Sequence, residues 1–499
     1  MPTRRDERQG QIVAGALSGN GLTGPGFTQA QFTASGFAVD VTDSGVDDGT
    51  TAPNHFGLYV NGTLPGQSRV VYNRLEGFPL GGGVIQGCDG HGTINAHIVA
   101  GFSSLAGFPF TDGDGYSYGL GIAPFVKVGS SVIFDPSFTF PSFPDLQSRA
   151  YRDGARISTN SWGEQVNGVY NVDSQAFDAL VRDAQPAGSA VPAPGSQPMV
   201  VVFAGGNQGP APTSLDAPGT AKNVITVGAS ENVRALGGAD QCGLDDTGAD
   251  MVGDIASFSS RGPTTDGRRK PDLVAPGTHV TGGVFQSDTP GPTGQAASCY
   301  DGTGVCGGPT GSFFPAGQQF YTASSGTSHS TPAVAGGAAL VRQYFINQGL
   351  VPPSPAMTKA FLMSSARYLT GVGTGDSLPS NAQGMGLMDL GMAFDGTARL
   401  LRDQAATDTF TATGQTRTFA GSVVDSSRPF RVTLAWTDAP GSTVGNAFRN
   451  DLDLTVRVGG VTYRGNVFSG ALSVAGGIAD QRNNVESVFL PAGSSGSFT

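Results

Sequence analysis

Five short apolar runs in the first half of the chain constrain the fold more than any other feature. They are FAVDVTDSG (37–45), KVGSSVIFD (127–135), ARISTNSWG (155–163), MVVVFAGGN (199–207) and NVITVGAS (223–230). Each run is rich in β-branched or apolar residues and ends in small or polar residues, which is typical of strands buried on both faces. Helix-like segments lie before two of the runs, at 145–155 and 173–185. This alternation predicts an α/β fold: a doubly wound, mostly parallel sheet with helices on both faces.

The pattern changes in the last quarter of the chain. The segment 354–367 has Ser at a cap position and Pro at the first helical position, which predicts one more helix. Beyond it, apolar residues alternate with period two in RVTLAWTD (431–438) and DLDLTVRV (451–458), with Gly-rich turns between them. We therefore expect a separate all-β sandwich over 405–499 after an N-terminal segment (1–30) and an α/β domain (31–400). The chain stops at SGSFT, which leaves open that the sandwich is truncated.

Charge and hydropathy exclude two classes of protein. The formal net charge of −11 argues against a nucleic-acid partner, because affinity for phosphates depends on clustered Lys and Arg. Without any stretch that approaches the roughly 18 continuous apolar residues of a membrane span, no membrane association is expected. Arg residues precede IVAGAL (12–17), but this run is shorter than a signal peptide requires, and we interpret it as a strand.

Four cysteines bear on the cellular compartment. Cys88, Cys242, Cys299 and Cys306 allow three complete pairings, and the short separation of Cys299 and Cys306 in a Gly-rich loop favours a local disulfide. Disulfides would indicate a secreted protein, while four reduced structural thiols remain the alternative. We expect secretion.

Three reactive side chains lie at the ends of predicted elements. Asp43 closes the first strand, His91 is flanked by glycines in DGHGTINAH, and Ser328 stands in SGTSHSTP just before a run of helix formers. A serine hydroxyl is a weak nucleophile unless a histidine takes its proton and a carboxylate fixes the imidazole tautomer. Asn207 follows a fourth strand, and its amide could donate to an oxyanion together with the Ser328 backbone N–H.

These motifs give the chain a specific resemblance. The order Asp, His, Ser with DSG, HGT and GTSHSTP resembles that of the subtilisin-like serine proteases over about residues 35–400. Three further stretches are similar to subtilase signatures, namely NSWG (160–163), PGTAKNVITVGAS (218–230) and SFSSRGPTTDGRRKPDLVAPG (257–277). In the last quarter, LAWTDAPGS and NDLDL resemble the alkaline subtilases that carry a C-terminal β-domain.

The resemblance implies a serine endopeptidase that works through an acyl-enzyme. It makes Asp43 the orienting carboxylate, His91 the general base, Ser328 the nucleophile and Asn207 the oxyanion donor. It further implies a substrate-binding segment that pairs with an extended peptide, with Trp162 lining a pocket; this segment consists of Ser161, Trp162 and Gly163. Protein or peptide substrates are the expected partners, and we expect a monomer.

Other polar groups receive weaker assignments. His329 stands where the family usually has Met, and His97 where Gly is usual, so a second imidazole beside the nucleophile could shift the pH profile or simply fill space. His55, His97 and His279 show no spacing of a metal site and are expected to be structural. No cofactor is required for the chemistry. Calcium is a candidate structural ion, and its candidate ligands are Asp451, Asp453 and Asp480.

Two other functions compete with this interpretation. The carboxyl-type relatives replace the base histidine with Glu; His91 in HGT argues against them, and activity at neutral pH would separate the two. A calcium-dependent adhesive protein with a degenerate catalytic domain is the non-enzymatic alternative. The presence of all three reactive residues disfavours it, and labelling by a fluorophosphonate would decide.

Overall fold

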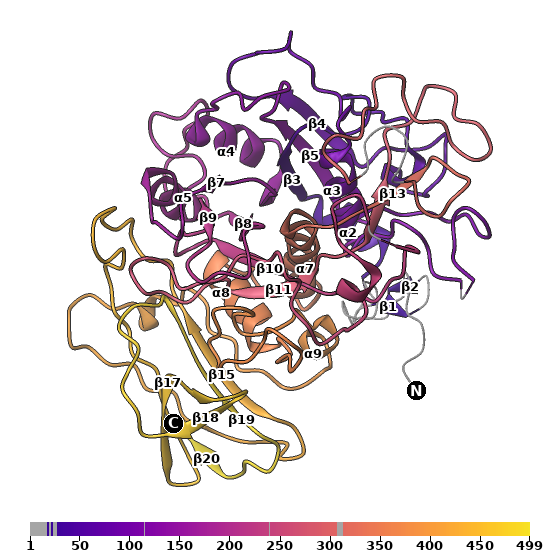
Figure 1. Ribbon diagram of the computed structural model, residues 1–499. Helices are drawn as coiled ribbons and strands as arrows, with labels where there is room; N and C mark the ends of the chain where they lie inside the picture. The colour runs from indigo at the N-terminus through magenta and orange to yellow at the C-terminus, as the bar shows by residue number, and fades with distance from the viewer. Residues whose placement is uncertain (1–16, 19–20, 23–26, 114, 239, 307–312) are drawn as a thin grey trace.

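A seven-stranded parallel sheet forms the centre of the first part of the protein (Figure 1). The structure is a computed structural model and describes residues 17–18, 21–22, 27–113, 115–238, 240–306 and 313–499. In spatial order the strands are β11 (Leu273–Pro276), β10 (Ile225–Ser230), β8 (Val200–Ala204), β6 (Ala155–Asn160), β3 (Ala38–Asp43), β5 (Lys127–Val132) and β4 (Val70–Leu75). Every neighbouring pair is parallel. The predicted fold class is confirmed, and the five predicted strands are all present.

Helices cover both faces of this sheet, as its strand sequences require. In β8, Val201 and Phe203 point to one face and pack against α5, whereas Val202 belongs to the cluster on the other face. The first face is covered by α4 (Phe143–Arg152) and α5 (Val172–Arg182). The second face carries α3 (His91–Ala100) and α7 (Thr327–Asn347). The two helices predicted before β6 and β8 are therefore α4 and α5.

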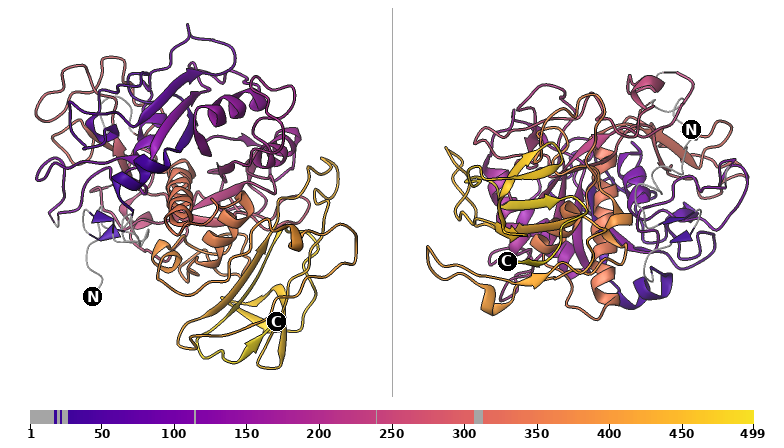
Figure 2. Two further views of the ribbon diagram at one scale, coloured as in Figure 1. Left: turned by 180° about the vertical axis from the view of Figure 1, so that it is seen from behind. Right: turned by 90° about the horizontal axis from the view of Figure 1, so that it is seen from below.

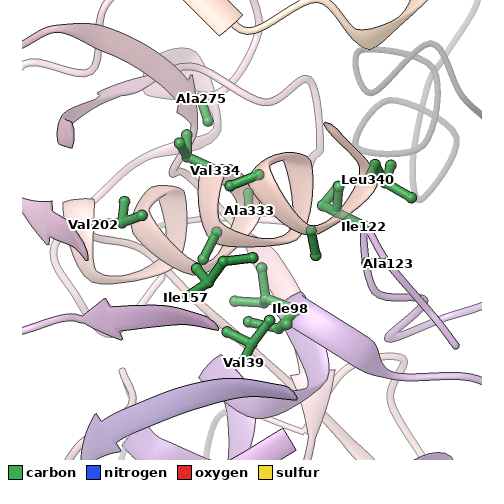
Figure 3. Close-up of a cluster of buried hydrophobic side chains, with 14 of the residues drawn as sticks. Val39, Ile98, Ile122, Ala123, Ile157, Val202, Ala275, Ala333, Val334 and Leu340 are labelled. Carbon is green, nitrogen blue, oxygen red and sulfur yellow. The ribbon is translucent and has the colours of Figure 1, made fainter. Parts of the chain in front are cut away.

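The helix α7 lies against the centre of the sheet, and Figure 3 shows its buried contacts. Val39, Ile157 and Val202 approach it from three neighbouring strands, and Ile98 approaches it from α3. The segment before β5 also lies close to α7, because the helix carries small residues: a Cβ at Gly336 would lie 2.7 Å from the Cβ of Ile122. Three further helices lie within the described residues of this part, namely α2 (Gln29–Ser35), α8 (Pro355–Ser364) and α9 (Leu390–Ala393).

The helix predicted over 354–367 is confirmed as α8. Ser354 caps it, since the Ser354 hydroxyl accepts a hydrogen bond from the Met357 N–H at 3.0 Å. Small antiparallel pairs lie around the main sheet: β1 (Leu17–Ser18) with β2 (Gly21–Leu22), β7 (Glu164–Gln165) with β9 (Asp216–Ala217), and β12 (Val280–Gly283) with β13 (Tyr321–Ser324). Three 3₁₀ turns are Phe56–Leu58, Asp246–Gly248 and Ala406–Asp408. The strand predicted at 12–17 falls outside the described residues except for Leu17, which belongs to β1.

The last part of the chain forms antiparallel β-sheets beside the α/β part, as Figures 1 and 2 show. One sheet contains β14 (Gly421–Ser422), β20 (Ser497–Phe498), β16 (Thr455–Val458), β17 (Val461–Ser469) and β18 (Leu472–Ala475); the other pairs β15 (Phe430–Ala435) with β19 (Val485–Leu490). Val456 and Val458 of the first sheet share a core with Val488 and Leu490 of the second. The predicted all-β architecture is confirmed, and we call this part the β-domain.

A buried ion pair joins the β-domain to the α/β part. Lys222 Nζ lies 2.8 Å from Asp438 Oδ2, and both side chains are fully buried. Lys222 Nζ also donates to the carbonyl oxygens of Ala439 and Ala447. The exact boundaries at 31–400 and 405–499 stay a prediction. None of the helices in the described part of the chain combines the length and apolar character of a membrane crossing.

Both disulfides connect distant parts of the sequence. Cys88 pairs with Cys299 across 211 residues, and Cys242 pairs with Cys306 across 64 residues. The local pairing that we expected between Cys299 and Cys306 is therefore wrong. The short separation of Cys299 and Cys306 in sequence does not show which other loops fold against them. Cys299 joins its loop to the segment beside His91, and Cys306 joins the same loop to a segment near Ser328.

Candidate active site

The reactive residues gather at one edge of the parallel sheet. Asp43 is the last residue of β3, Ser161 directly follows β6, and Asn207 comes three residues after β8. These three strands are neighbours, so their carboxyl ends lie side by side. The next two strands along the chain after β3, which are β4 and β5, lie on one side of it, and the following strands, β6 and β8, lie on the other. Ligands of open α/β sheets bind at the carboxyl edge where the strand order reverses in this way.

Asp43 and His91 form a hydrogen-bonded ion pair at this edge. His91 is the first residue of α3, and its Nδ1 lies 2.7 Å from Asp43 Oδ1. The Asp43 carboxylate also accepts from the Ser44 backbone N–H at 2.8 Å. Asp43 is buried, whereas the His91 side chain retains 20% exposure, so the imidazole is the part of the pair that a ligand can reach.

A chain of four side chains fixes which nitrogen of His91 carries a hydrogen. A carboxylate only accepts, so Asn95 Nδ2 donates to Asp43 Oδ2 at 3.0 Å, and this orients the amide. Asn95 Oδ1 must then accept from His329 Nδ1 at 2.9 Å. Because Asp43 Oδ1 accepts from His91 Nδ1, Nε2 of the neutral His91 ring is left with the lone pair that can accept a proton.

The N-terminal turn of α7 holds Ser328 against the segment that follows β6. Pro332 has no N–H and cannot bond the carbonyl of Ser328 four residues earlier. That carbonyl instead accepts from Ser161 Oγ at 2.7 Å, while Ser328 Oγ donates to the Ser161 carbonyl at 3.3 Å. No hydrogen bond among the described residues joins Ser328 Oγ to His91. The ring centroids of His91 and His329, the residue after Ser328, are 5.8 Å apart, so the imidazole lies beside this helix start.

Asn207 is held with its amide nitrogen available. Its Oδ1 accepts from both the backbone N–H and the hydroxyl of Thr327, each at 2.9 Å. Asn207 therefore caps α7, and the Nδ2 group is left to donate. Nδ2 lies beside Gly326, two residues before Ser328, and Asn207 is exposed. An amide N–H beside the start of α7 can donate to an oxyanion that forms next to Ser328.

Burial and neighbouring charges shift the pKa values of His91 and Asp43 in opposite directions. Burial would lower the pKa of His91, but the charge and hydrogen bond of Asp43, aided by the charge of Asp89, raise it to about 9. Burial would raise the pKa of Asp43, but His91 and the hydrogen bonds from Ser44 and Asn95 hold it below its usual value. The site is therefore built to stabilise an imidazolium.

His329 behaves differently although it stands beside the same pair. Burial lowers its pKa to about 3, and the charge of His91 adds to this. The ring is 1% exposed and neutral at ordinary pH. His329 therefore adds no positive charge beside His91 and acts as a hydrogen-bond donor to Asn95.

The expected substrate segment lies on the other side of Ser328. Ser161 is buried, and Gly163 is exposed directly before β7, which pairs with β9. The ring of Trp162 packs against Phe143 and Phe203, with centroids 5.6 and 5.2 Å away. Trp162 is thus anchored in a phenylalanine cluster and only partly exposed. Its role in a side-chain pocket stays a prediction.

The remaining histidines have partners in the interior. His97 and His55 lie in contact, with 3.1 Å between Nε2 and Nδ1, and each also bonds a backbone carbonyl. His279 bonds the carbonyl of Arg234 and faces Asp240. All three are 0% exposed, as expected of structural residues.

The calcium candidates fit an ion only in part. Asp480 already accepts four hydrogen bonds, from the backbones of Arg482 and Asn483 and the amides of Asn466 and Asn483. Asp451 and Asp453 are exposed. Among the described residues, one group of three potential metal ligands has its ligand atoms within 4.8 Å of one another. It lies elsewhere, at Asp240, Cys242 and Cys306, and both of its sulfur atoms are in a disulfide.

Two residues that contact the Asp43–His91 pair, Asn95 and Asp89, were not predicted from the sequence. Asn95 lies inside a helix and belongs to no motif that predicts a function. Asp89 directly follows Cys88, and only the cysteine was considered at that point of the sequence. A usable signal existed for Asn95: it lies four residues after His91, and residues four apart share one face of a helix. That spacing places Asn95 directly behind the imidazole.

Comparisons with known proteins identify the family of this chain. Residues 34–386 match the model of the Subtilase family (Peptidase_S8). Serine protease AprX of Bacillus subtilis (strain 168) is 34% identical over 180 residues, 36% of this chain and 32% of that protein. The serine protease/ABC transporter B family protein tagD of Dictyostelium discoideum is 25% identical over 374 residues, 59% of this chain and 18% of that protein. The chain thus spans a third or less of these relatives.

Among solved structures, the chain is similar to fervidolysin from Fervidobacterium pennivorans, a keratinolytic enzyme related to subtilisin. That structure is 19% identical with a TM-score of 0.45, and the match covers 99% of this chain and 56% of that one.

The contact between Asn95 and Asp43 can be tested directly. Asn95→Ala removes a donor to a buried carboxylate, and hydrogen bonds to charged groups are worth about 1.5–3 kcal/mol, so we expect Ser328 to react with a fluorophosphonate about 10- to 100-fold more slowly. His329→Met leaves the Asn95–Asp43 bond and should slow the reaction less. The double variant should be non-additive, because the two residues act in one chain. The exposed Asn61→Ala is the control; an Asn95 variant as fast as this control would contradict the assignment.

Proposed function

From the premise that the chain belongs to the subtilase family of serine proteases, we propose that it is a serine endopeptidase in which Ser328 is the nucleophile and His91 the base. The observation that carries the proposal is the 2.7 Å contact between His91 Nδ1 and Asp43 at the sheet edge where α7 begins with Ser328. A histidine in the base position distinguishes the site from a carboxyl-type enzyme.

The geometry supports the following reaction. A peptide carbonyl carbon is attacked by Ser328 Oγ while His91 Nε2 takes the hydroxyl proton. The oxyanion that forms accepts hydrogen bonds from Asn207 Nδ2 and from the Ser328 backbone N–H at the start of α7. His91 returns the proton to the leaving amine, which leaves an acyl-enzyme on Ser328. Water then attacks the acyl carbon while His91 takes its proton. The bond from the acyl carbon to Ser328 Oγ breaks, the acid leaves, and His91 returns the proton to Ser328 Oγ, so the protein's own groups suffice for each step.

Substrate binding follows from the exposed backbone beside the site. We propose that an extended peptide adds as a strand along Ser161–Gly163, because Gly163 is exposed and precedes the short antiparallel strand β7. We further propose that the protein acts on protein or peptide substrates as a monomer. The two disulfides support secretion into an oxidising compartment.

Calcium is proposed as a structural ion of the β-domain. Burial raises the pKa of Asp451, and the charges of Asp453 and Asp480 raise it further. Glu486, fully buried beside them, has an Oε1 with no hydrogen-bond partner. A hard divalent cation would relieve this repulsion and supply that partner. Since Asp480 is saturated by amide donors, we assign the main role to Asp451 and Asp453.

Calcium binding is tested by stability. Adding calcium to chelator-treated protein should raise the thermal unfolding midpoint by several degrees, since a ligand bound at about 100 times its dissociation constant adds about 2.7 kcal/mol. The doubly substituted Asp451→Asn, Asp453→Asn protein should lose this response, whereas the exposed Asp425→Asn should keep it. An equal calcium response in the double variant would contradict the site.

The oxyanion assignment predicts a large loss of turnover. Asn207→Leu should lower kcat about 100- to 1,000-fold, as the loss of one oxyanion donor typically does. Because Asn207 also caps α7, Asn207→Asp is the matched variant: it keeps the accepting Oδ1 but has no N–H to donate, so it should be at least as slow. Ser328→Ala should abolish fluorophosphonate labelling. An Asn207→Asp enzyme with parental turnover would show that capping, and not donation, matters.

The raised pKa of His91 predicts activity that increases toward alkaline pH. His91 must be neutral to accept a proton, so kcat/KM should climb with pH, reach half its maximum near the pKa of about 9 and level off above it. Asp89→Asn removes one charge that favours the imidazolium, and the rising limb should move to lower pH by about half to one unit. The exposed Asp288→Asn should leave it in place. If kcat/KM of the parent protein instead rose with a midpoint near pH 6.5, this account would be contradicted.

A further inference from the structure

The segment 299–306 is joined to the rest of the protein at both ends by disulfides. Cys299 is bonded to Cys88, and Cys306 is bonded to Cys242. All of its residues are described, and none of them lies in a helix or a strand. Its position therefore depends on the two disulfides and on contacts with its neighbours. We call this segment the cysteine loop.

The inner face of the cysteine loop packs against the proposed base. A Cβ at Gly304 would lie 2.6 Å from His91 Cβ and 2.8 Å from Asp89 Oδ2. The Gly304 N–H donates to the backbone carbonyl of Asp89 at 2.9 Å, and the Asp301 N–H donates to that of Cys88 at 2.9 Å. The loop thus touches the residue on which the proposed proton transfer depends.

The same loop covers the turn that holds His91 at the start of α3. Asp89 Oδ1 accepts from Ser44 Oγ at 2.6 Å and from the His91 backbone N–H at 3.1 Å. A Cβ at Gly90 would lie 2.9 Å from the ring of Tyr300, which is buried. Without the loop, this turn would face water, and the imidazole would be held less firmly against its carboxylate partner.

The other end of the cysteine loop lies near the proposed nucleophile. The Cys306 backbone N–H donates to Ser324 Oγ at 3.3 Å. Cys242 Sγ lies 3.5 Å from the carbonyl oxygen of Ser325. Both serines belong to the segment that leads into α7 and Ser328. One disulfide therefore fastens the loop on the side of the base, and the other fastens it on the side of the nucleophile.

A small thiol can reach both disulfides. Cys299 and Cys242 are exposed, whereas their partners Cys88 and Cys306 are partly buried. Thiol–disulfide exchange begins with the attack of a thiolate on an accessible sulfur, so one exposed cysteine in each pair is sufficient. The redox state of the loop can therefore change in the folded protein.

We propose that the two disulfides are a redox switch: the reduced protein releases the cysteine loop and is poorly active, and disulfide formation fixes the loop and activates the site. This inference rests on the proposed peptidase function and adds its regulation. A small disulfide such as glutathione disulfide is the oxidant for each pair. Two cysteine thiols lose their protons and two electrons to form an S–S bond, and the S–S bond of glutathione disulfide breaks to give two thiols. Activity would then begin when the protein leaves a reducing compartment.

The test compares the oxidised protein with the same protein reduced by a trialkylphosphine, which takes up oxygen from water and leaves four thiols. After removal of the phosphine, the rate constant of Ser328 labelling by a fluorophosphonate and kcat/KM for a peptide are measured above pH 9, where His91 is neutral. We expect both to fall about 10- to 100-fold, because displacing a catalytic group by about 1 Å can cost about 100-fold. Glutathione disulfide should restore them. A reduced protein that is folded by circular dichroism and keeps the oxidised rates would overturn the proposal.

Variants that lack one disulfide test each end of the loop. The Cys88→Ala, Cys299→Ala protein should label slowly whether or not it is treated with the phosphine, because the loop is free on the side of the base. The Cys242→Ala, Cys306→Ala protein should still slow down on reduction, because the disulfide beside the base remains. Labelling of the first variant at the rate of the oxidised parent would contradict the switch.

The extent of labelling separates a released loop from unfolding. Unfolded molecules would not label at all, whereas a released loop should slow the labelling of every molecule and leave the final extent unchanged. If the reduced protein unfolds, Gly304→Ala decides: it keeps both disulfides, but its methyl group would push the loop away from His91, so the oxidised variant should label slowly. The exposed Ser298→Ala beside the loop is the control and should label at the parental rate.

The remaining outcomes assign a failure to one proposal or the other. Labelling of oxidised Gly304→Ala as fast as Ser298→Ala would show that the loop does not act on His91 and would overturn the switch. An oxidised parent protein that neither cleaves a peptide nor reacts with a fluorophosphonate would instead overturn the peptidase function itself.

Discussion

The close packing of α7 against the parallel sheet is the constraint on which the site depends. The helix begins at the carboxyl edge of the sheet and runs beneath β3, β6 and β8, which end in Asp43, Asn160 and Ala204. Small residues along α7 let neighbouring segments approach it, and a Cβ at Gly336 would already collide with Ile122 in the segment before β5. Close-packed interiors transmit such displacements. A bulkier helix would therefore move Ser328 away from both Ser161 and Asn207.

Hydrogen bonds at the start of α7 turn this packing into a defined chemical site. Pro332 frees the Ser328 carbonyl, which Ser161 then binds, and Asn207 caps the same turn through Thr327. On the opposite side, the donors from His329 and Asn95 can point only toward Asp43, because the carboxylate cannot donate. The two sets of bonds come from residues far apart in sequence, and together they fix the direction of each proton near Ser328.

Sequence patterns were sufficient for the parts of this structure that are locally encoded. Strands buried on both faces have continuous apolar sequences, so five of the seven were predicted, whereas the half-exposed β4 and the four-residue β11 gave no such pattern. The disulfide partners were not predictable, since pairing depends on how the loops near His91 and Ser328 fold together. Asn95 was missed for a related reason: it lies in an unremarkable helical sequence, and its partners Asp43 and His329 are 52 and 234 residues away.

The buried carboxylates of Asp43 and Asp216 differ in how completely the protein satisfies their hydrogen-bonding oxygens. Asp43 is surrounded by donors from Ser44, Asn95 and His91, so its charge is stabilised before any ligand arrives. Asp216 has an oxygen with no donor at all. A group that must hold a base in one orientation throughout turnover benefits from complete pairing. Burial therefore raises the pKa of Asp216 to about 6, whereas the charge of His91 and the surrounding hydrogen bonds hold the pKa of Asp43 below its usual value.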